Sequence, residues 1–330
     1  MRMKLHCNNF HEKEGVMKKQ GQSSQLWSVI LAGGDGLRMQ PMIQQWLGKP
    51  KPKQYCTFVG TRSMFQHTVD RALRLTKPER TVTVIARSHE AEAWSQLGGR
   101  VCGKVLVQPK NFGTGPGIFL PLTYIRAKEK NGTVVIYPSD HFIYPEDRFL
   151  EIVELAEWVV ERMPHRPVLL AAPADRLEVE YGWILPADVH SVVDGYRLCT
   201  IERFLEKPNV IQARQALAAN GMWNMLVLVT KIEAIWSLGW EYFPEMMMLF
   251  ERLEKVIGTS EECTVLNAIY EVMPNKDLSF DLLQHVPRRM MALEVNGVLW
   301  SDWGQPDRIE KTLEKLNKKP AFSMDYLASV

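Results

Sequence analysis

The sequence predicts an α/β fold, a doubly wound, mostly parallel mixed sheet with helices on both faces. Short apolar runs alternate with helical patterns through the first half of the chain, at 28–32, 81–86, 104–108, 133–137 and 167–172. Most of these runs are continuously apolar, which is typical of central strands covered on both faces. With 330 residues, of which 46% are hydrophobic and 24% charged, the chain has the size and composition of one large globular domain.

Helices are expected between and after these strands. Residues 63–75 place Phe65, Val69 and Ala72 on one stripe, and 147–163 carries the clearest amphipathic pattern of the chain. The second half changes character, because 196–205 and 223–230 resemble antiparallel strands added to a parallel core. The remaining expected elements are helices at 231–239 and 245–256, a strand at 292–300 and a final helix at 307–316.

The chain shows no internal repeat, low-complexity linker or clear boundary. We therefore expect a single domain over 26–330, with a substrate-binding insertion at about 175–290. Residues 1–25 are polar and basic and lack the apolar stretch of a secretory signal. They are expected to form a disordered N-terminal extension, in which Met17 is an alternative start.

Composition argues against several classes of function. A formal net charge of +2 disfavours binding nucleic acid by bulk electrostatics, and no apolar run is long enough to span a bilayer. The five cysteines are scattered and form no Cys-x-x-Cys, which favours a reduced protein. We expect a cytoplasmic protein with no nucleic-acid or membrane partner.

A glycine-rich turn follows the first predicted strand. The segment Leu31-Ala32-Gly33-Gly34-Asp35-Gly36 can adopt positive φ and turn successive N–H groups toward an anion. Arg38 and Lys53 add the positive charge that phosphoryl transfer requires. The dinucleotide fingerprint lacks its third glycine here, and the P-loop pattern is absent. Glycines alone fit an ordinary strand-to-helix turn equally well, but the cations favour a polyphosphate site.

Two aspartates follow later predicted strands. Asp140 comes after 133–137, and Asp302 comes after the strand that ends at 299. Open α/β sheets bind ligands at the carboxyl ends of their strands, so both carboxylates are candidate site residues. The alternatives are a helix N-cap at Ser139 or Asp140 and a simple turn at Asp302.

These motifs resemble those of the sugar-nucleotide pyrophosphorylases, most closely the mannose-1-phosphate guanylyltransferase branch. The shared patterns are Leu-Ala-Gly-Gly-x-Gly-x-Arg with a later Pro-Lys-Gln, Pro-Ser-Asp-His at 138–141, and Trp-x-Asp-x-Gly at 300–304. The resemblance implies a Rossmann-like nucleotide-diphospho-sugar transferase fold. It also implies that Arg38 and Lys53 contact a triphosphate and that Asp140 and Asp302 bind Mg²⁺ or another divalent cation. These four residues are the expected catalytic set.

The same resemblance implies a sugar-phosphate site. In Phe-x-Glu-Lys-Pro at 204–208, Glu206 would accept hydrogen bonds from sugar hydroxyls and Lys207 would bind the phosphate. Gly182, in Tyr-Gly-x-Ile, would let the sugar approach the backbone, and Asn224, in Trp-Asn, would bind the sugar. The alternatives are a surface Glu-Lys pair and a glycine that marks a β-bulge.

The segment 108–117 aligns with the loop that surrounds the base, Glu-Pro-x-x-Arg-Asn-Thr-Ala-Pro-Ala in the family. Thr114 and Pro116 match, whereas Gln108, Phe112 and Gly113 depart from the pattern. Leu37 is a further departure, because it replaces a polar residue before the arginine. The residues expected to bind the nucleotide are Leu31, Ala32, Gly33, Gly34, Gly36, Arg38, Lys53, Gln108, Gly113, Thr114 and Pro116.

The activity that the resemblance implies is transfer of GMP from GTP to mannose 1-phosphate, giving GDP-mannose and pyrophosphate. A phosphate oxygen is already anionic at neutral pH, so no general base is required, and His141 is expected to support the site rather than act as a base. Another sugar or base, such as glucose 1-phosphate with dTTP, stays open. So do a non-catalytic sugar-nucleotide-binding module, which the departures at Leu37, Phe112 and Gly113 motivate, and a homodimer.

Overall fold

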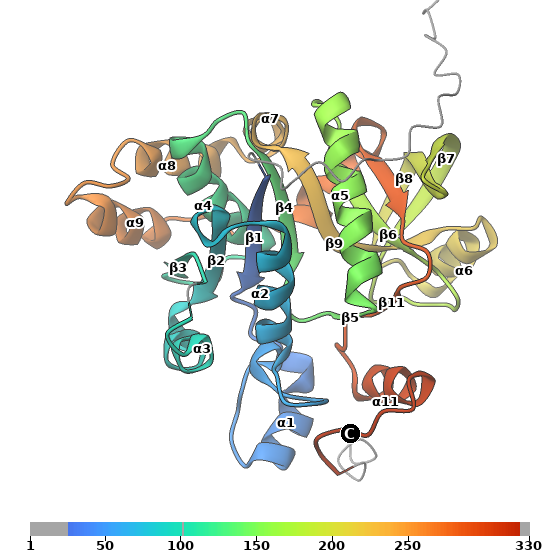
Figure 1. Ribbon diagram of the computed structural model, residues 1–330. Coiled ribbons are helices and arrows are strands. Elements are labelled where there is room, and N and C mark those ends of the chain that lie inside the picture. The colour runs from blue at the N-terminus through green and yellow to red at the C-terminus, as the bar shows by residue number, and fades with distance from the viewer. Residues whose placement is uncertain (1–25, 101, 324–330) are drawn as a thin grey trace, which may run out of the picture.

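A computed structural model describes residues 26–100 and 102–323, so the expectation for residues 1–25 lies outside the described residues. Its centre is a nine-stranded sheet in the order β3-β2-β1-β4-β9-β6-β10-β8-β7 (Figure 1). The strands are β1 (Leu26–Ala32), β2 (Thr81–Ala86), β3 (Lys104–Gln108), β4 (Thr133–Pro138), β6 (Val168–Pro173), β7 (Gly182–Val193), β8 (Tyr196–Glu206), β9 (Met222–Lys231) and β10 (Met291–Glu294). A second, two-stranded sheet pairs β5 (Phe142–Tyr144) with β11 (Leu299–Ser301).

The nine-stranded sheet is mixed. Strands β3, β2, β1 and β4 are parallel, which confirms the alternating strand-helix prediction for the first half. Strand β9 then enters antiparallel between β4 and β6, and β7 and β8 form an antiparallel hairpin at the far edge. Among the described residues of this sheet, four strand pairings are parallel and five antiparallel, so the expectation of a mostly parallel, doubly wound sheet describes only one half.

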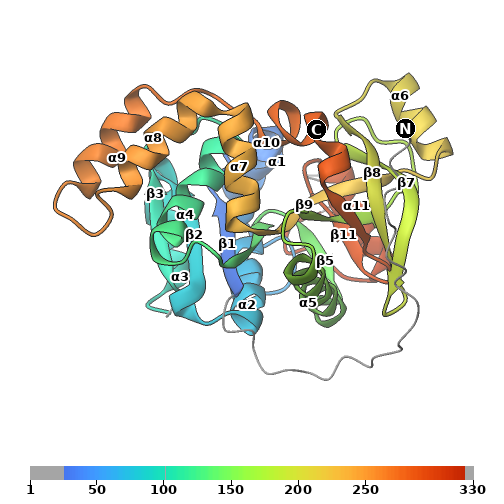
Figure 2. The same ribbon diagram turned by 90° about the horizontal axis from the view of Figure 1, so that it is seen from above.

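Helices cover both faces of this sheet, because alternate residues of each strand point to opposite sides. On β1, Leu26 and Ile30 belong to one hydrophobic cluster, whereas Trp27 and Val29 belong to the other. The first cluster is covered by α2 (Met64–Leu75), α3 (Glu90–Leu97) and α5 (Glu146–Arg162). The second is covered by α4 (Thr114–Lys128), α7 (Ile232–Tyr242), α8 (Pro244–Glu254) and α9 (Glu262–Glu271), as Figure 2 shows from above.

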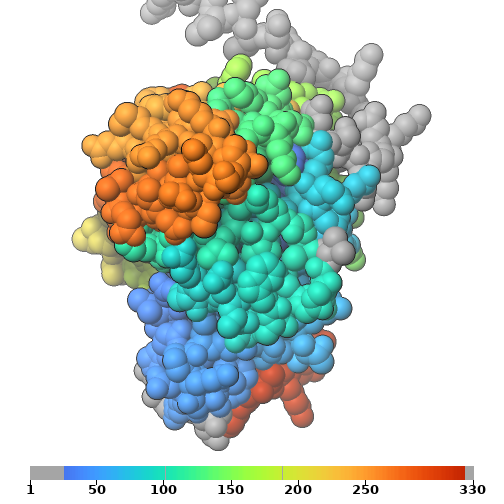
Figure 3. Space-filling view, turned by 90° about the vertical axis from the view of Figure 1, so that its left-hand side faces the viewer, coloured from blue at the N-terminus to red at the C-terminus, as the bar shows by residue number. Residues whose placement is uncertain are grey.

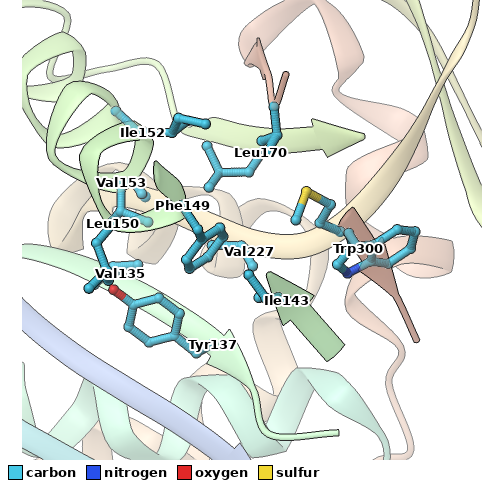
Figure 4. Packing of buried hydrophobic residues seen from close by; sticks show 14 of the residues in the cluster. Val135, Tyr137, Ile143, Phe149, Leu150, Ile152, Val153, Leu170, Val227 and Trp300 are labelled. Carbon is cyan, nitrogen blue, oxygen red and sulfur yellow. The ribbon is translucent and has the colours of Figure 1, made fainter. Parts of the chain in front are cut away.

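Helix α5, which has the clearest amphipathic pattern in the sequence, packs in the first cluster. Phe149, Leu150 and Val153 of α5 lie against Val135 and Tyr137 of β4 (Figure 4). Their spacing of three to four residues forms one apolar face of a helix. Because these side chains are fully buried, α5 fixes β4, and β4 leads directly to Asp140.

The single strand expected at 292–300 is wrong. Asn296 and Gly297 form a turn, with Gly297 at φ +74°, so the segment divides into two strands. Strand β10 pairs with β6 and β8 in the main sheet, whereas β11 pairs with β5 in the second sheet. This turn carries the chain from the main sheet to the strand that precedes Asp302.

A third, smaller core lies beyond the strand ends. It joins α1 (Gln40–Leu47) to α11 (Pro306–Lys315) through the buried side chains of Met42, Phe58, Trp303 and Ile309. The two segments 37–60 and 302–322 lie side by side at one end of the molecule, blue and red in Figure 3. The glycine-rich turn and Asp302 are thus held next to each other by packing. Within the described residues, no helix has the length and apolar character needed to cross a membrane.

Candidate active site

The glycine-rich turn follows β1 at its carboxyl end, and two glutamine side chains bind its carbonyl groups. Gln54 Nε2 donates to the carbonyl of Gly34 at 2.8 Å, and Gln40 Nε2 donates to that of Asp35 at 3.2 Å. In a trans peptide the N–H points opposite to the carbonyl, so the amides of Asp35 and Gly36 face away from these side chains. Gly36 has φ +60°, and a Cβ there would lie 3.2 Å from the backbone nitrogen of Lys53. The turn therefore presents N–H groups, as an anion site requires.

Lys53 lies at the centre of the site. Its Nζ is 3.0 Å from Asp140 Oδ2 and donates to the carbonyl of Asp302 at 2.5 Å, and its side chain is 6% exposed. Asp140 follows β4 and Asp302 follows β11, so the two predicted aspartates meet at one cation although the chain between them is long. No helix begins at Ser139, whose hydroxyl donates instead to the carbonyl of Leu31 at 2.7 Å, so the alternative of an N-cap is wrong.

The carboxylate of Asp302 is bound by Arg308, which sequence reasoning missed. Arg308, on α11, donates to both oxygens of Asp302, at 2.7 and 2.9 Å, and is 5% exposed. Tyr181 donates its hydroxyl to Oδ1 at 2.9 Å. Burial would raise the pKa of Asp302, but the charges of Lys53 and Arg308 outweigh it and lower the pKa to about 2. Asp302 is therefore ionised throughout the physiological range.

Asp140 is also held as the anion. Burial opposes its ionisation, but Lys53 and His141 outweigh burial and lower its pKa. His141 accepts a hydrogen bond at Nδ1 from Trp300 Nε1 at 3.2 Å, and burial lowers the pKa of the ring. His141 Nε2 lies 3.7 Å from Asp140 Oδ1, so the ring stands beside this carboxylate without a direct hydrogen bond to it. The supporting role expected for His141 stays a prediction.

A cavity of about 350 Å³ opens in front of these groups, within the usual size range of small-molecule sites. It is lined by Asp35, Gly36, Leu37, Arg38, Met39, Lys53, Asn111, Asp140 and Gly304. The Arg38 side chain is 47% exposed, and Arg38 Nη1 lies 2.5 Å from Glu180 Oε2. Leu37 is 74% exposed at the rim, so the departure at this position removes a polar group from the cavity mouth.

The two aspartates are unequal candidates for binding a divalent cation. Asp140 fits, because it is ionised, its side chain is 36% exposed, and it lines the cavity. Asp302 is ionised as well, but Arg308 binds both of its oxygens. The described residues contain no group of three or more His, Cys, Asp and Glu side chains arranged for a metal. Proteins usually bind magnesium through one or two carboxylates, and substrate phosphate and water fill the remaining positions. The pair of aspartates fits that chemistry.

The predicted sugar-phosphate residues gather at the ends of β7, β8 and β9. A Cβ on Gly182 would lie 2.9 Å from Glu206 Oε2 and 3.3 Å from the Cβ of Asn224, so the absence of a side chain here makes the close approach possible. Lys207 Nζ lies 3.7 Å from Glu206 Oε1. Burial raises the pKa of Glu206 to about 7, against the opposing effect of Lys207. The oxygen of Asn224 accepts from Leu226 N at 3.0 Å.

The predicted base loop is held by backbone contacts and by one side-chain hydroxyl. Gly113 has φ +90°, and a Cβ there would lie 2.5 Å from the carbonyl oxygen of Lys276. That carbonyl also accepts from Gly115 N at 2.8 Å, and Lys276 N donates to the carbonyl of Phe112 at 3.0 Å. The hydroxyl of Thr114 donates to Asp277 at 3.1 Å and accepts from Leu278 N at 2.7 Å. Thr114 thus ties the loop to residues 276–278 and does not line the cavity.

Other predicted nucleotide residues take different places. Gln108 is buried, and its Nε2 has no hydrogen-bond partner among the described residues. Its Oε1 lies 3.6 Å from where a Cβ on Gly33 would be, so the base loop and the glycine-rich turn touch at this amide. Pro116 is buried in the first turn of α4. The carbonyl of Ala32 accepts from Gln54 at 3.1 Å and from Tyr55 OH at 3.0 Å.

Known proteins with similar sequences support these motifs, although their sequence identity to this chain is low. The chain is 24% identical over 283 residues to the alginate biosynthesis protein AlgA of Pseudomonas fluorescens, covering 84% of the chain and 56% of the relative. It is 23% identical over 288 residues to a mannose-1-phosphate guanylyltransferase of Escherichia coli, covering 86% of the chain and 60% of the relative. The chain thus spans little more than half the length of these curated relatives.

Solved structures share the fold. One described as a mannose-1-phosphate geranyltransferase from Thermus thermophilus superposes with a TM-score of 0.74 at 21% identity, covering 88% of this chain and 79% of that one. A putative glucose-1-phosphate thymidylyltransferase from Bacillus anthracis superposes with a TM-score of 0.53 at 16% identity, covering 91% and 98%. The sequence profile described as Nucleotidyl transferase matches residues 27–319. The chain belongs to the nucleotidyl transferase family.

Proposed function

We propose that the protein transfers a nucleoside monophosphate from a nucleoside triphosphate to a sugar 1-phosphate, with GTP and mannose 1-phosphate as the first pair to test. One observation carries the proposal. Arg38, Lys53 and Asp140 line one cavity beside the glycine-rich turn, and Asp302 lies directly behind Lys53. Two cations and two ionised carboxylates at the carboxyl ends of strands suit a reaction between two phosphate groups.

The chemistry needs little beyond position and charge. An oxygen of the sugar phosphate would attack the α-phosphorus in line, the bond from that phosphorus to the bridging oxygen would break, and pyrophosphate would leave. Arg38 and Lys53 would neutralise the charge on the leaving group. Lys207 would bind the attacking phosphate, while Glu206 and Asn224 would hydrogen-bond the sugar beside Gly182. The attacking oxygen is already anionic, so no proton has to be removed.

Asp140 and Asp302 would hold Mg²⁺ or another divalent cation, which supplies positive charge to the phosphates when bound. Asp140 faces the cavity and is the more accessible ligand of the two. Asp302 would have to share its oxygens between the cation and Arg308.

The second candidate function is that of a pyrophosphorylase for another base or sugar. Its support comes from the base loop. Gln108 brings a buried amide with an unpaired nitrogen to the edge of the glycine-rich turn, where the family pattern has an acidic residue. A change in hydrogen-bonding groups at such a position alters which base is accepted. Glucose 1-phosphate with dTTP is therefore part of the same test.

The test is a matrix of GTP, ATP, dTTP, UTP and CTP against mannose, glucose and other hexose 1-phosphates, with pyrophosphate release as the readout. The proposal expects release that depends on both substrates and is fastest for one pair. Binding of a sugar nucleotide without any release would favour the non-catalytic binding module and contradict the proposal.

A further inference from the structure

Arg38 already has an anionic partner. Glu180 Oε2 lies 2.5 Å from Arg38 Nη1, whereas the nearest oxygen of Asp302 is 3.8 Å from Arg38 Nη2. Both side chains remain accessible, Arg38 at 47% and Glu180 at 31%. A carboxylate and a phosphate offer a guanidinium the same kind of acceptor. A phosphate that binds Arg38 from the cavity therefore competes with Glu180.

Glu180 has a second set of partners that Arg38 does not share. Its Oε2 accepts from Arg308 Nη2 at 2.9 Å, and Gln305 Nε2 donates to Oε1 and Oε2 at 3.2 and 3.3 Å. Arg308 is buried and its position is fixed by Asp302. If Arg38 leaves, Glu180 keeps two partners: the Gln305 amide and the Arg308 cation, which it shares with Asp302 and Glu178. Its carboxylate therefore stays hydrogen-bonded after the exchange.

We propose that Glu180 occupies the phosphate position on Arg38 in the ligand-free protein, and that the triphosphate displaces it while Arg308 and Gln305 retain it. The inference rests on the proposed function in one respect, namely that Arg38 binds the triphosphate. Glu180 then sets the affinity of the site for polyphosphate without touching the reacting atoms. The opposite possibility is that Glu180 holds Arg38 in its binding position, and the two differ in the sign of a measurable effect.

The neighbouring carboxylate supplies a matched control. Glu178 Oε2 lies 3.0 Å from the same Arg308 nitrogen, but the contacts of Arg38 are with Glu180 and Asp302. Glu178→Gln removes one negative charge from the same cluster and leaves the pair at Arg38 in place. Glu180→Gln removes that pair and keeps the size of the side chain.

The experiment measures binding of inorganic tripolyphosphate, a probe with no base or sugar, by calorimetry at low ionic strength in the wild-type protein and in both variants. We expect Glu180→Gln to bind about twofold to fivefold more tightly, as for loss of a partly exposed ion pair, and Glu178→Gln to differ from wild type by less. The gain should shrink in high salt. Steady-state kinetics should show a lower KM for the triphosphate and an unchanged KM for the sugar phosphate.

The outcomes separate this inference from the proposed function. A tighter site cannot result from misfolding, so a gain confined to Glu180→Gln supports the exchange. Equal or weaker binding by Glu180→Gln, with wild-type binding intact, overturns the inference and leaves the proposed function standing. Absence of tripolyphosphate binding by the wild-type protein and by both variants overturns the inference together with the phosphate site of the proposed function.

Discussion

The phosphate-facing side of the site and its base loop are held together in different ways. On the phosphate side, Lys53, Asp140, Asp302 and Arg308 are joined through charged side chains, with contacts of 2.5 to 3.0 Å. In the base loop, Gly113 and Gly115 pack against the carbonyl of Lys276, and the links are main-chain hydrogen bonds and those of the uncharged Thr114 hydroxyl. The first side matches the family motifs at its charged positions, whereas the loop departs from them at 108, 112 and 113.

The difference teaches how one fold can keep a reaction and change its substrate. Charge recognition needs a few groups at fixed distances. Here the aspartates follow β4 and β11, whereas Lys53 and Arg308 lie on a short turn and on α11. Base recognition needs hydrogen-bonding groups, and we propose that they lie on the loop at 108–117, whose shape depends on glycines at 113 and 115. We therefore expect substitutions on the phosphate side to act through charge and substitutions in the loop to act through backbone shape.

The largest effect is expected from removing the central cation. Lys53→Ala should lower turnover by about 10²–10³-fold, because a preorganised positive charge at the developing phosphate charge is lost. Lys51→Ala is the matched control, since Lys51 pairs with Glu92 at 2.8 Å outside the cavity. Pyrophosphate release and circular dichroism of both variants measure turnover and folding. Near-normal turnover of a folded Lys53→Ala protein would contradict the assignment of Lys53.

The second effect concerns stability of the phosphate side. Arg308→Met leaves Asp302 and the neighbouring glutamates without their buried cation and should lower the free energy of unfolding by about 3–5 kcal/mol. Arg288→Met removes an exposed arginine that pairs with Glu202 and should cost less than about 1 kcal/mol. Urea unfolding of both variants provides the comparison. Equal losses would show that the Arg308 cluster is no more than a surface ion pair.

A smaller effect is expected in the base loop, where the cause is backbone shape. Gly113→Ala places a side chain at φ +90° and against the Lys276 carbonyl, which should cost about 1–3 kcal/mol. The same substitution at Gly98, where φ is +54° and the nearest atom is 3.9 Å away, should cost about 1 kcal/mol. In kinetics, Gly113→Ala should raise the KM for the triphosphate more than that for the sugar phosphate. A lower turnover number with unchanged KM values for both substrates would contradict the proposed difference between the two regions.

The smallest effect is a pH dependence at Glu206. Its pKa is raised to about 7 by burial, so the carboxylate that we propose to accept hydrogen bonds from the sugar is lost as pH falls below 7. The KM for the sugar phosphate should therefore rise about twofold to tenfold between pH 7.5 and pH 6. Because the folded protein binds this proton more tightly than the unfolded chain, stability from this group falls as pH rises from about 4.5 to 7.

The variant Glu206→Gln distinguishes the titration of Glu206 from that of the substrate, whose phosphate has a pKa of about 6. The pH profile that remains in Glu206→Gln belongs to the sugar phosphate, and the difference from wild type belongs to Glu206. Identical pH profiles for the wild-type protein and the variant would contradict the proposed role of Glu206 in binding the sugar.

Much of the fold was predictable because the central strands are continuously apolar and α5 has one apolar face. Helix α4 was not predicted, because it is buried on several sides and contains Pro116 and Pro121, so it has no stripe of apolar residues. The strand expected at 292–300 was wrong because an Asn-Gly turn interrupts an otherwise uniform apolar run. Sequence periodicity does not distinguish one bent segment from two strands in different sheets.

The convergence of Asp140 and Asp302 was expected from the rule that strand ends share one edge of a sheet, together with the family motifs. The rule does not explain it, because Asp302 follows β11, which belongs to the second sheet. Arg308, Glu178 and Glu180 could not be found in this way. Arg308 lies 128 residues from Glu180, and the two meet because α11 packs in the third core against the strand ends. An arginine in the first turn of a mostly polar helix gives no signal in the sequence that it is buried.

The most direct test follows labelled phosphorus through the reaction. With GTP labelled separately at the α and γ positions and mannose 1-phosphate as acceptor, the wild-type protein should transfer the α label to a sugar nucleotide and release the γ label in pyrophosphate. Lys53→Ala should do neither at a comparable rate. Release of the γ label as inorganic phosphate, or no transfer of the α label from any triphosphate to any sugar 1-phosphate, would contradict the proposed reaction.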